Sequence, residues 1–211
     1  MGIKEDYLVE SISYRDAMNI VIEKHYLHRK CPVSHAFGLI DRSTKEIVGV
    51  VTYGVSPSST LLKGICGPDE AKNVYELNRL WVDDRVAKNG ESYLVANSMK
   101  YLDREIVVSF ADTSQGHVGI IYQAANFLYT GLSSKFRDPK VKGLENQHHA
   151  TYANGLTNAQ VIEKFGEDNV YFVDRPRKHR YIYFNCSKTK RKELIKKLRY
   201  KVIEYPKSHL A

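Results

Sequence analysis

An aspartate, a histidine and a tyrosine lie close together in the segment Ser109–Gly131. Asp112 and His117 follow an apolar run that predicts a buried strand, and Tyr122 lies in a short predicted helix after a polar loop. Ligands of α/β proteins bind where a strand end faces a helix N-terminus, because free main-chain donors and short polar side chains converge there. The segment therefore predicts a chemical site. A solvated loop with a tyrosine packed in the core is the alternative.

Two further side chains are candidates for the same site. His28 follows the first predicted helix, where a neutral imidazole could act as a base near neutral pH or be a plain surface residue. Arg79 lies in the middle of a predicted strand, where an unpaired charge is costly. Arg79 therefore requires an anion, either an acid such as Glu76 or a phosphate. Asp112 could accept a proton, hold a substrate amine, or cap the turn that follows it.

The elements that must position these residues alternate between helix and strand. A helix beginning after Ser13, a hairpin over 36–55 and a strand over 74–82 come first, and the segment Pro57–Asn73 predicts a long loop. A polar turn, a helix, the strand before Asp112, the short helix and another strand follow. This order predicts an α/β (α+β) fold with a mixed central sheet. We expect residues 1–132 to form the core and 133–211 a basic extension packed on it, as one structural unit.

Positive charge is concentrated near the C-terminus. The chain has a formal net charge of +8, and Glu193 is the only acid between Arg175 and Lys201. Such a density predicts a polyanionic partner, with nucleic acid first, although a solvated helix face is the alternative. The residues expected to contact nucleic acid are Arg177, Lys178, Arg180, Lys190, Arg191, Lys196 and Lys197.

Composition excludes several other classes of protein. The chain has 211 residues, is 43% hydrophobic and 27% charged, and holds no apolar run of the roughly 18 residues that a membrane helix needs. Its acidic N-terminal segment does not predict a secretory signal. Three widely spaced cysteines predict reduced thiols in a cytoplasm and no structural zinc site. The histidines show no recognisable ligand spacing, so the sequence predicts no particular metal.

The order of the elements resembles the GNAT acyltransferase fold. In that fold, the turn between the fourth strand and the next helix holds the pyrophosphate of coenzyme A. The resemblance implies such a role for Arg85, Lys88, Asn89, Gly90 and Ser92. It also implies that Tyr122 is a general acid for a departing thiolate. The turn departs from the usual GNAT signature, which has two glycines, or a glycine and an alanine, after an Arg or Gln.

Several segments together resemble the bacteriophage Mom family. They are HYLHRKCPVSHAFG, ELNRLWVDDRVAKNGES, SFADTSQGHVGIIYQAANFLYTG and KHRYIYFN with the ending KKLRYKVIEYPK. The resemblance implies a GNAT-like enzyme that uses acetyl-coenzyme A to convert adenine in DNA to N6-carbamoylmethyladenine. This modification protects phage DNA from restriction in the cytoplasm of the infected host. The implied reaction centre is His28, Arg79, Asp112 and Tyr122.

The implied chemistry sets two requirements. The amine of adenine is paired inside duplex DNA, so an enzyme must flip the base out or act on a single strand. Attack of this amine on a thioester carbonyl gives an acetamide, whereas the product of the family is bonded through the methyl carbon and ends in a carboxamide. Two alternatives are an ordinary GNAT N-acetyltransferase for a protein or small amine, and a non-catalytic DNA-binding protein.

Overall fold

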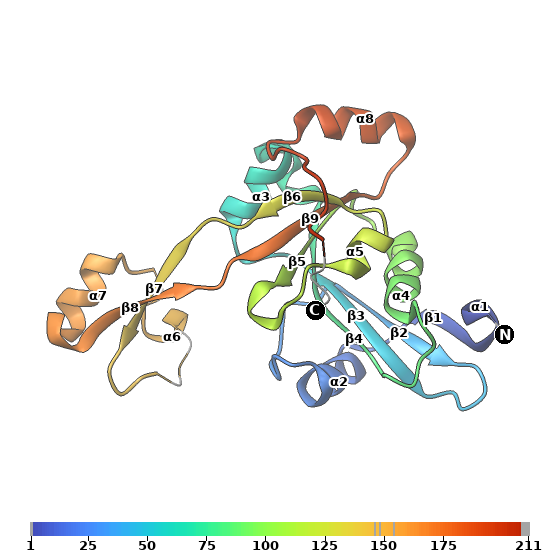
Figure 1. Ribbon diagram of the computed structural model, residues 1–211, viewed down its shortest axis with the longest axis horizontal. Helices are drawn as coiled ribbons and strands as arrows, with labels where there is room; N and C mark the ends of the chain where they lie inside the picture. The colour runs from blue at the N-terminus through green and yellow to red at the C-terminus, as the bar shows by residue number, and fades with distance from the viewer. Residues whose placement is uncertain (1, 146, 148, 154, 208–211) are drawn as a thin grey trace.

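The computed structural model describes residues 2–145, 147, 149–153 and 155–207 (Figure 1). In this part of the chain, the centre of the fold is a seven-stranded sheet. Its strands, in spatial order, are β1 (Tyr7–Ser11), β2 (His35–Asp41), β3 (Ile47–Gly54), β4 (Val74–Val82), β5 (Ile106–Asp112), β9 (Lys178–Phe184) and β6 (Leu128–Leu132). Only β4 and β5 are parallel neighbours, and the other pairs are antiparallel. The α/β fold with a mixed central sheet, predicted from the sequence, is confirmed.

Helices cover both faces of the sheet because its central strands are apolar on both faces. On one face, α4 (Gly90–Ser98) and α5 (Ile120–Ala124) pack Leu94 and Tyr122 into the largest hydrophobic cluster. On the other face, α2 (Tyr14–Lys24) covers β2 and β3, whereas α3 (Ser59–Cys66) and α8 (Lys188–Lys197) cover β5 and β9. A short helix, α1 (Ile3–Asp6), precedes β1.

The prediction of a long loop over Pro57–Asn73 is wrong, because most of this segment is helical. Ser58 accepts a hydrogen bond from the main-chain N–H of Leu61 and caps α3. Ile65 is fully buried on the second face of the sheet. The apolar spacing of Leu61 and Ile65 is therefore a helical signal that Gly64, Gly67 and Pro68 obscured.

The strands β4 and β5 diverge halfway along their length. Their ladder joins Val74–Leu77 to Ile106–Ser109 and goes no further. Beyond it, β4 stays paired with β3 as far as Val82, and β5 stays paired with β9 as far as Asp112. The Ser109 hydroxyl donates to the Leu77 carbonyl (3.1 Å) where the ladder ends. The inner edges of the two strands beyond this point border the site described below.

Residues 133–177 form an arm that projects from the core (Figure 1). Its ribbon is β7 (Phe136–Val141) paired with β8 (Val170–Arg175), and α6 (His149–Ala153) and α7 (Asn158–Phe165) pack on it. Val141, Tyr152 and Val161 form a separate small core there. The predicted extension, 133–211, is thus divided: the arm leaves the core, whereas β9 lies inside the central sheet between β5 and β6. Sequence reasoning placed the boundary where polarity rises, but Tyr181, Ile182 and Phe184 of β9 are buried in the central sheet.

Candidate active site

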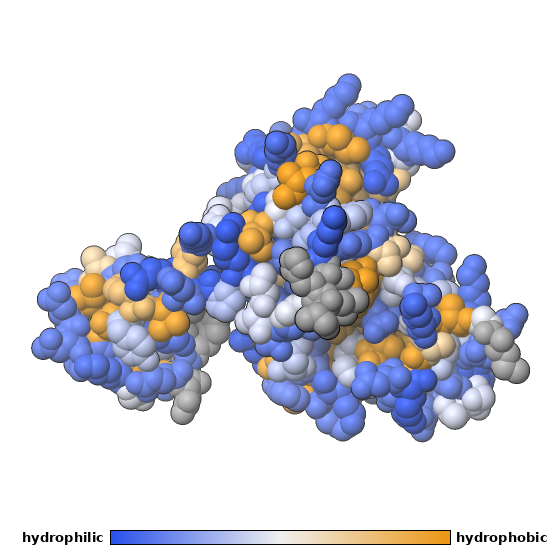
Figure 2. All heavy atoms as spheres, in the orientation of Figure 1, coloured by the Kyte–Doolittle hydropathy of each residue, from blue (hydrophilic) through white to orange (hydrophobic). Residues whose placement is uncertain are grey.

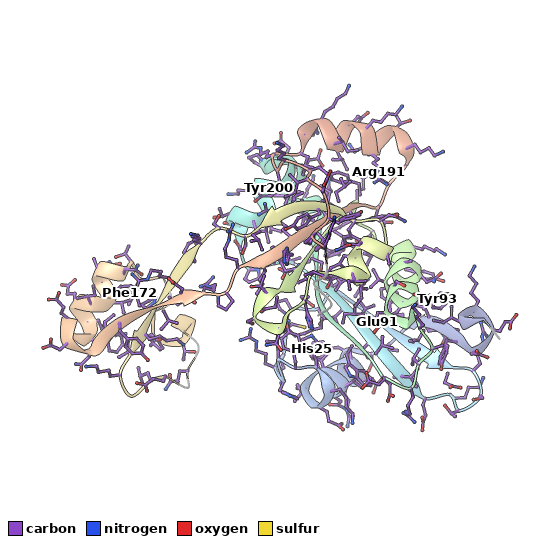
Figure 3. All side chains as sticks on the ribbon, viewed as in Figure 1. His25, Glu91, Tyr93, Phe172, Arg191 and Tyr200 are labelled. Carbon is purple, nitrogen blue, oxygen red and sulfur yellow. The ribbon has the colours of Figure 1, made fainter. Side chains whose placement is uncertain are left out.

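A cavity of about 560 Å³ lies where β4 and β5 diverge. Its walls are Leu77–Val82 of β4, Phe110–Asp112 of β5, the loop that leads into α5, and residues at the ends of α2 and α4. Figure 3 labels His25 and Glu91, the side chains that line the cavity from these two helix ends. Three of the four predicted catalytic residues, Arg79, Asp112 and Tyr122, line this one cavity.

Arg79 brings a buried positive charge to the cavity. Its side chain is 9% exposed, and burial lowers the pKa of its guanidinium. Nη1 donates to the Asn78 carbonyl (2.6 Å) and Nη2 to the Lys30 carbonyl (3.5 Å), whereas Nε has no hydrogen-bond partner among the described residues. The same part of the chain holds no ion pair to Arg79. A buried guanidinium held only by carbonyls is costly, and an anionic ligand would supply the missing partner.

Asp112 lies at the carboxyl end of β5, at the edge of the cavity. Its carboxylate accepts from the main-chain N–H (3.0 Å) and hydroxyl (2.7 Å) of Ser114, and it lies 3.3 Å from the ammonium of Lys178. Burial acts to raise the pKa of Asp112, but the hydrogen bonds from Ser114 and the charge of Lys178 outweigh it, so the pKa is lowered. Asp112 therefore both caps the following turn and presents an ionised carboxylate to the cavity.

Tyr122 is buried among aromatic rings, with centroids 5.5 Å from Phe127 and 5.4 Å from Tyr181. Burial raises the pKa of its phenol to about 12, against a smaller opposing effect of the Ser109 hydroxyl. At neutral pH the Tyr122 hydroxyl is therefore protonated and can donate a hydrogen bond into the cavity.

The start of α5 is fixed by close contact with β9. Gly119 has a φ of +80°, and a Cβ atom at this position would lie 2.4 Å from the Tyr181 ring. The Tyr181 hydroxyl donates to the Val118 carbonyl and accepts from the side-chain amide of Gln123 (3.1 Å). These contacts hold the turn before α5, and with it Tyr122, against the sheet.

His25 and Tyr26, which sequence reasoning did not select, line the cavity from the end of α2. His25 is 6% exposed, and burial, with a further contribution from Arg79, lowers its pKa to about 4. Its Nδ1 accepts a hydrogen bond from the main-chain N–H of Leu27 (3.1 Å). Since an accepting nitrogen carries no proton, the neutral ring carries its proton on Nε2. The Tyr26 ring stacks on His25 (4.4 Å between centroids), and the residue as a whole is 43% exposed.

The structure does not bring His28 to the cavity. Its side chain is exposed, its φ is +44°, and its ring Nδ1 donates back to the Ile22 carbonyl (2.9 Å). His25 continues the buried stripe of α2 formed by Met18 and Val21, and this spacing is the signal that would have distinguished it from His28.

The turn before α4 offers main-chain donors. Asn89 precedes the helix with a φ of +76°, and the N–H groups of Gly90 and Tyr93 bond to nearby carbonyls. Among the described residues, no hydrogen bond is recorded for the N–H groups of Glu91 and Ser92. The first turn of this nine-residue helix therefore has free donors and the positive end of the helix dipole.

The side chains of this turn are less suited to a phosphate than its main chain. The Arg85 guanidinium is held by both carboxylate oxygens of Asp83, each at 2.9 Å, and Glu91 adds an acid to the wall of the cavity. Lys88 is exposed, and no ion pair is recorded for it in the described part of the chain. The turn thus fits a pyrophosphate through the N–H groups of Glu91 and Ser92 and through Lys88.

The residues predicted to contact nucleic acid are dispersed. Arg177 donates to the Ser133 carbonyl (2.6 Å), and Arg180 donates to the Thr130 hydroxyl (2.9 Å) while lying over the Tyr200 ring. Lys178 faces Asp112 at the cavity, as described above. The structure thus gives Arg177 and Arg180 roles inside the fold.

The remaining four lie on α8. Lys197 contacts Glu70 (2.5 Å), Lys190 lies 3.6 Å from Glu193, Arg191 lies over the Tyr183 ring, and Lys196 is exposed. Figure 3 shows Arg191 on α8 at the end of the core opposite His25.

The described residues hold no group of three or more His, Cys, Asp or Glu side chains placed to bind a metal ion. Within the same described part, none of the helices combines the length and apolar character required to span a bilayer.

Comparison with known proteins identifies relatives over nearly the whole chain. The Mom protein family matches residues 6–207. Methylcarbamoylase mom of Escherichia phage Mu is 32% identical over 213 residues, which cover 94% of this chain and 83% of that protein.

Solved structures give weaker matches. A GNAT-family acetyltransferase from Bacillus cereus (11% identity, TM-score 0.46) covers 86% of this chain and 99% of that one. The ribosomal-protein-S5-alanine acetyltransferase from Vibrio fischeri (13% identity, TM-score 0.48) covers 85% and 93%. The family match and the phage relative both span the strands, the loops and the helix that build the cavity. The chain belongs to the Mom protein family.

Proposed function

We propose that this protein is a transferase that converts adenine in DNA to N6-carbamoylmethyladenine with acetyl-coenzyme A as a substrate. In the cytoplasm of an infected bacterium, this activity would protect phage DNA from restriction. The relative from phage Mu is named a methylcarbamoylase. The observation that carries the proposal is the cavity between β4 and β5, where Arg79, Asp112 and Tyr122 meet the stacked pair His25–Tyr26.

The donor side of this cavity is the gap between the two strands. The inner edges of β4 beyond Leu77 and of β5 beyond Ser109 are not paired with one another, so their main-chain groups can bond to an extended chain such as pantetheine. The N–H groups of Glu91 and Ser92, with Lys88, would hold the pyrophosphate. When bound, acetyl-coenzyme A supplies a two-carbon unit as a thioester. The Tyr122 hydroxyl holds the proton that this wall can donate.

The base side is the wall formed by the end of α2 and the end of β5. The exposed face of Tyr26 offers a stacking surface for a flipped base, supported from behind by His25. The Watson–Crick edge of adenine has one donor, at N6, and one acceptor, at N1. The ionised carboxylate of Asp112 can accept a hydrogen bond from N6.

Arg79 supplies positive charge between these two sides. Its guanidinium has no carboxylate partner among the described residues, so a phosphate or a developing oxyanion on the substrate would be the first anion that it meets.

The proposed product constrains the reaction. A bond from N6 to the thioester carbonyl carbon would release the thiolate and leave an N6-acetyl group. The carbamoylmethyl product instead has its new bond between N6 and the methyl carbon. Replacing a C–H bond of the methyl group by this C–N bond is a two-electron oxidation, so the reaction also needs a two-electron oxidant as a co-reactant. The amide nitrogen, which displaces the coenzyme A thiolate, must come from a further nitrogen-containing co-substrate. The assay must therefore distinguish these two products.

Expression of the protein together with a plasmid tests the proposal. After digestion of the plasmid to nucleosides, mass spectrometry should detect deoxyadenosine enlarged by one carbamoylmethyl group. An N6-acetyl nucleoside would indicate an ordinary acetyltransferase. Unmodified deoxyadenosine from cells that contain the folded protein would contradict the proposal. Calorimetric titration with acetyl-coenzyme A separates both enzymes from a non-catalytic DNA-binding protein, which would not bind it.

A further inference from the structure

Three exposed cations lie on segments that are attached to the walls of the cavity. Arg29 and Lys30 follow the end of α2, and Lys135 lies between β6 and β7 where the arm leaves the core. For none of them is an ion pair recorded in the part of the chain that the structure describes. We call Arg29, Lys30 and Lys135 the rim. In Figure 2, hydrophilic side chains gather where the arm joins the core.

Main-chain contacts attach Arg29 and Lys30 to the cavity. The carbonyl of Lys30 accepts from Nη2 of Arg79 (3.5 Å), so this segment runs directly beside the buried arginine. Arg29 is also close enough for its charge to lower the pKa of His25, after the larger effects of burial, Arg79 and His28.

The neck of the arm is attached to the other side of the cavity. Lys178 lies 3.3 Å from Asp112, and the Thr113 hydroxyl donates to the Arg177 carbonyl (2.6 Å). The main chains of Ser133 and Lys178 are joined there, since the Ser133 N–H donates to the Lys178 carbonyl (2.8 Å). Lys135 is therefore only two residues after Ser133, whose main chain is attached to the Asp112 side of the cavity through Lys178.

A flipped nucleotide places a geometric demand on this region. The base rotates out of the stack, but its sugar stays bonded to the phosphates on both sides. These phosphates must therefore lie at the mouth of whichever cavity receives the base. They need positive charge at that mouth, whereas α8, which carries most of the basic tail, is at the opposite end of the core from His25 (Figure 3).

We propose that the rim, rather than α8, binds the phosphates of duplex DNA on either side of the flipped adenine. This inference rests on the proposed function, because it takes the cavity as the site of the base. The DNA would then cover a track from the end of α2, across the mouth of the cavity, to the neck of the arm.

Salt-dependent binding to a short duplex tests the inference. A rim variant carries Arg29→Gln, Lys30→Gln and Lys135→Gln. A matched control carries Lys188→Gln, Lys192→Gln and Lys201→Gln, which removes the same charge from exposed positions on and after α8. Fluorescence anisotropy at several salt concentrations gives the slope of log K against log salt. Loss of three phosphate contacts should reduce this slope by about 2 to 3 in the rim variant. The control should keep the wild-type slope.

Equal slopes for the wild type and the rim variant would overturn the inference, as would a larger reduction in the control, which would place DNA on α8. The binding assay contains neither acetyl-coenzyme A nor modified product. A failure of the proposed function is instead read from the plasmid nucleosides of the wild-type protein, so the two failures are distinguishable.

Discussion

The buried histidine of the cavity predicts a specific loss of stability in mild acid. The pKa of His25 is lowered to about 4 in the folded protein, from 6.5 in an exposed chain. The unfolded chain therefore binds a proton more readily than the folded one over this interval, and stability is lost as the pH falls through it. At about 1.4 kcal/mol for each pKa unit, the full effect is about 3 kcal/mol, of which about 2 kcal/mol falls between pH 7 and pH 5.

Urea denaturation of the wild type and of His25→Asn at about pH 7 and about pH 5 measures this effect. The Oδ1 atom of asparagine can replace Nδ1 as the acceptor for the Leu27 N–H, but it does not titrate. The comparison cancels the contribution of His179, whose pKa burial also lowers. We expect the free energy of unfolding of the wild type to fall by about 2 kcal/mol more than that of the variant. Equal losses would show that His25 is not the buried neutral imidazole described above.

Three further predictions address other walls of the cavity. Tyr122→Phe should lower the rate of adenine modification by about 10² to 10⁴-fold with little change in melting temperature, since only the donating hydroxyl is removed; an unchanged rate would exclude a proton-donor role. Glu91→Gln should tighten acetyl-coenzyme A binding about fivefold in a calorimetric titration, because it removes an acid beside the proposed phosphate site. Weaker binding would contradict the placement of the pyrophosphate beside Glu91. Gly119→Ala should lower the free energy of unfolding in urea by about 3 kcal/mol, whereas Gly116→Ala should lower it by about 1 kcal/mol. The φ angle is positive at both glycines, but only at Gly119 would an added Cβ atom meet Tyr181. Equal effects would refute the contact.

Where a residue lay on a strongly patterned element, the sequence located it correctly within the fold. Asp112 ends an apolar strand, and Tyr122 lies in the helix after it, so local pattern alone placed both at one junction. Arg79 was selected because a mid-strand charge needs a partner, and the structure shows a guanidinium held by carbonyls. None of these three inferences needed long-range information.

The selection of His28 over His25 depended on detail that local pattern does not give. The helix ends between Lys24 and His25, and the chain then reverses so that His28 points back along α2. Which of two histidines three residues apart faces a cavity is decided by that turn.

The basic tail shows the same limit at longer range. Charge density along the chain does not reveal that Arg177 donates to a carbonyl just after β6 and that Arg180 donates to a carbonyl of β6. Nor does it reveal that β9 enters the central sheet while α8 passes to the far end of the core.

In the proposed function, the cavity around Arg79 carries out the modification of adenine. Arg79→Met keeps an unbranched apolar stem but removes a buried charge whose Nε lacks a partner among the described residues, so the variant should be at least as stable as the wild type. The decisive measurement is the mass of the deoxyadenosine recovered from a plasmid expressed beside each protein. We expect a carbamoylmethyl group with the wild type and none with folded Arg79→Met. Equal modification by both proteins would contradict this role of the cavity.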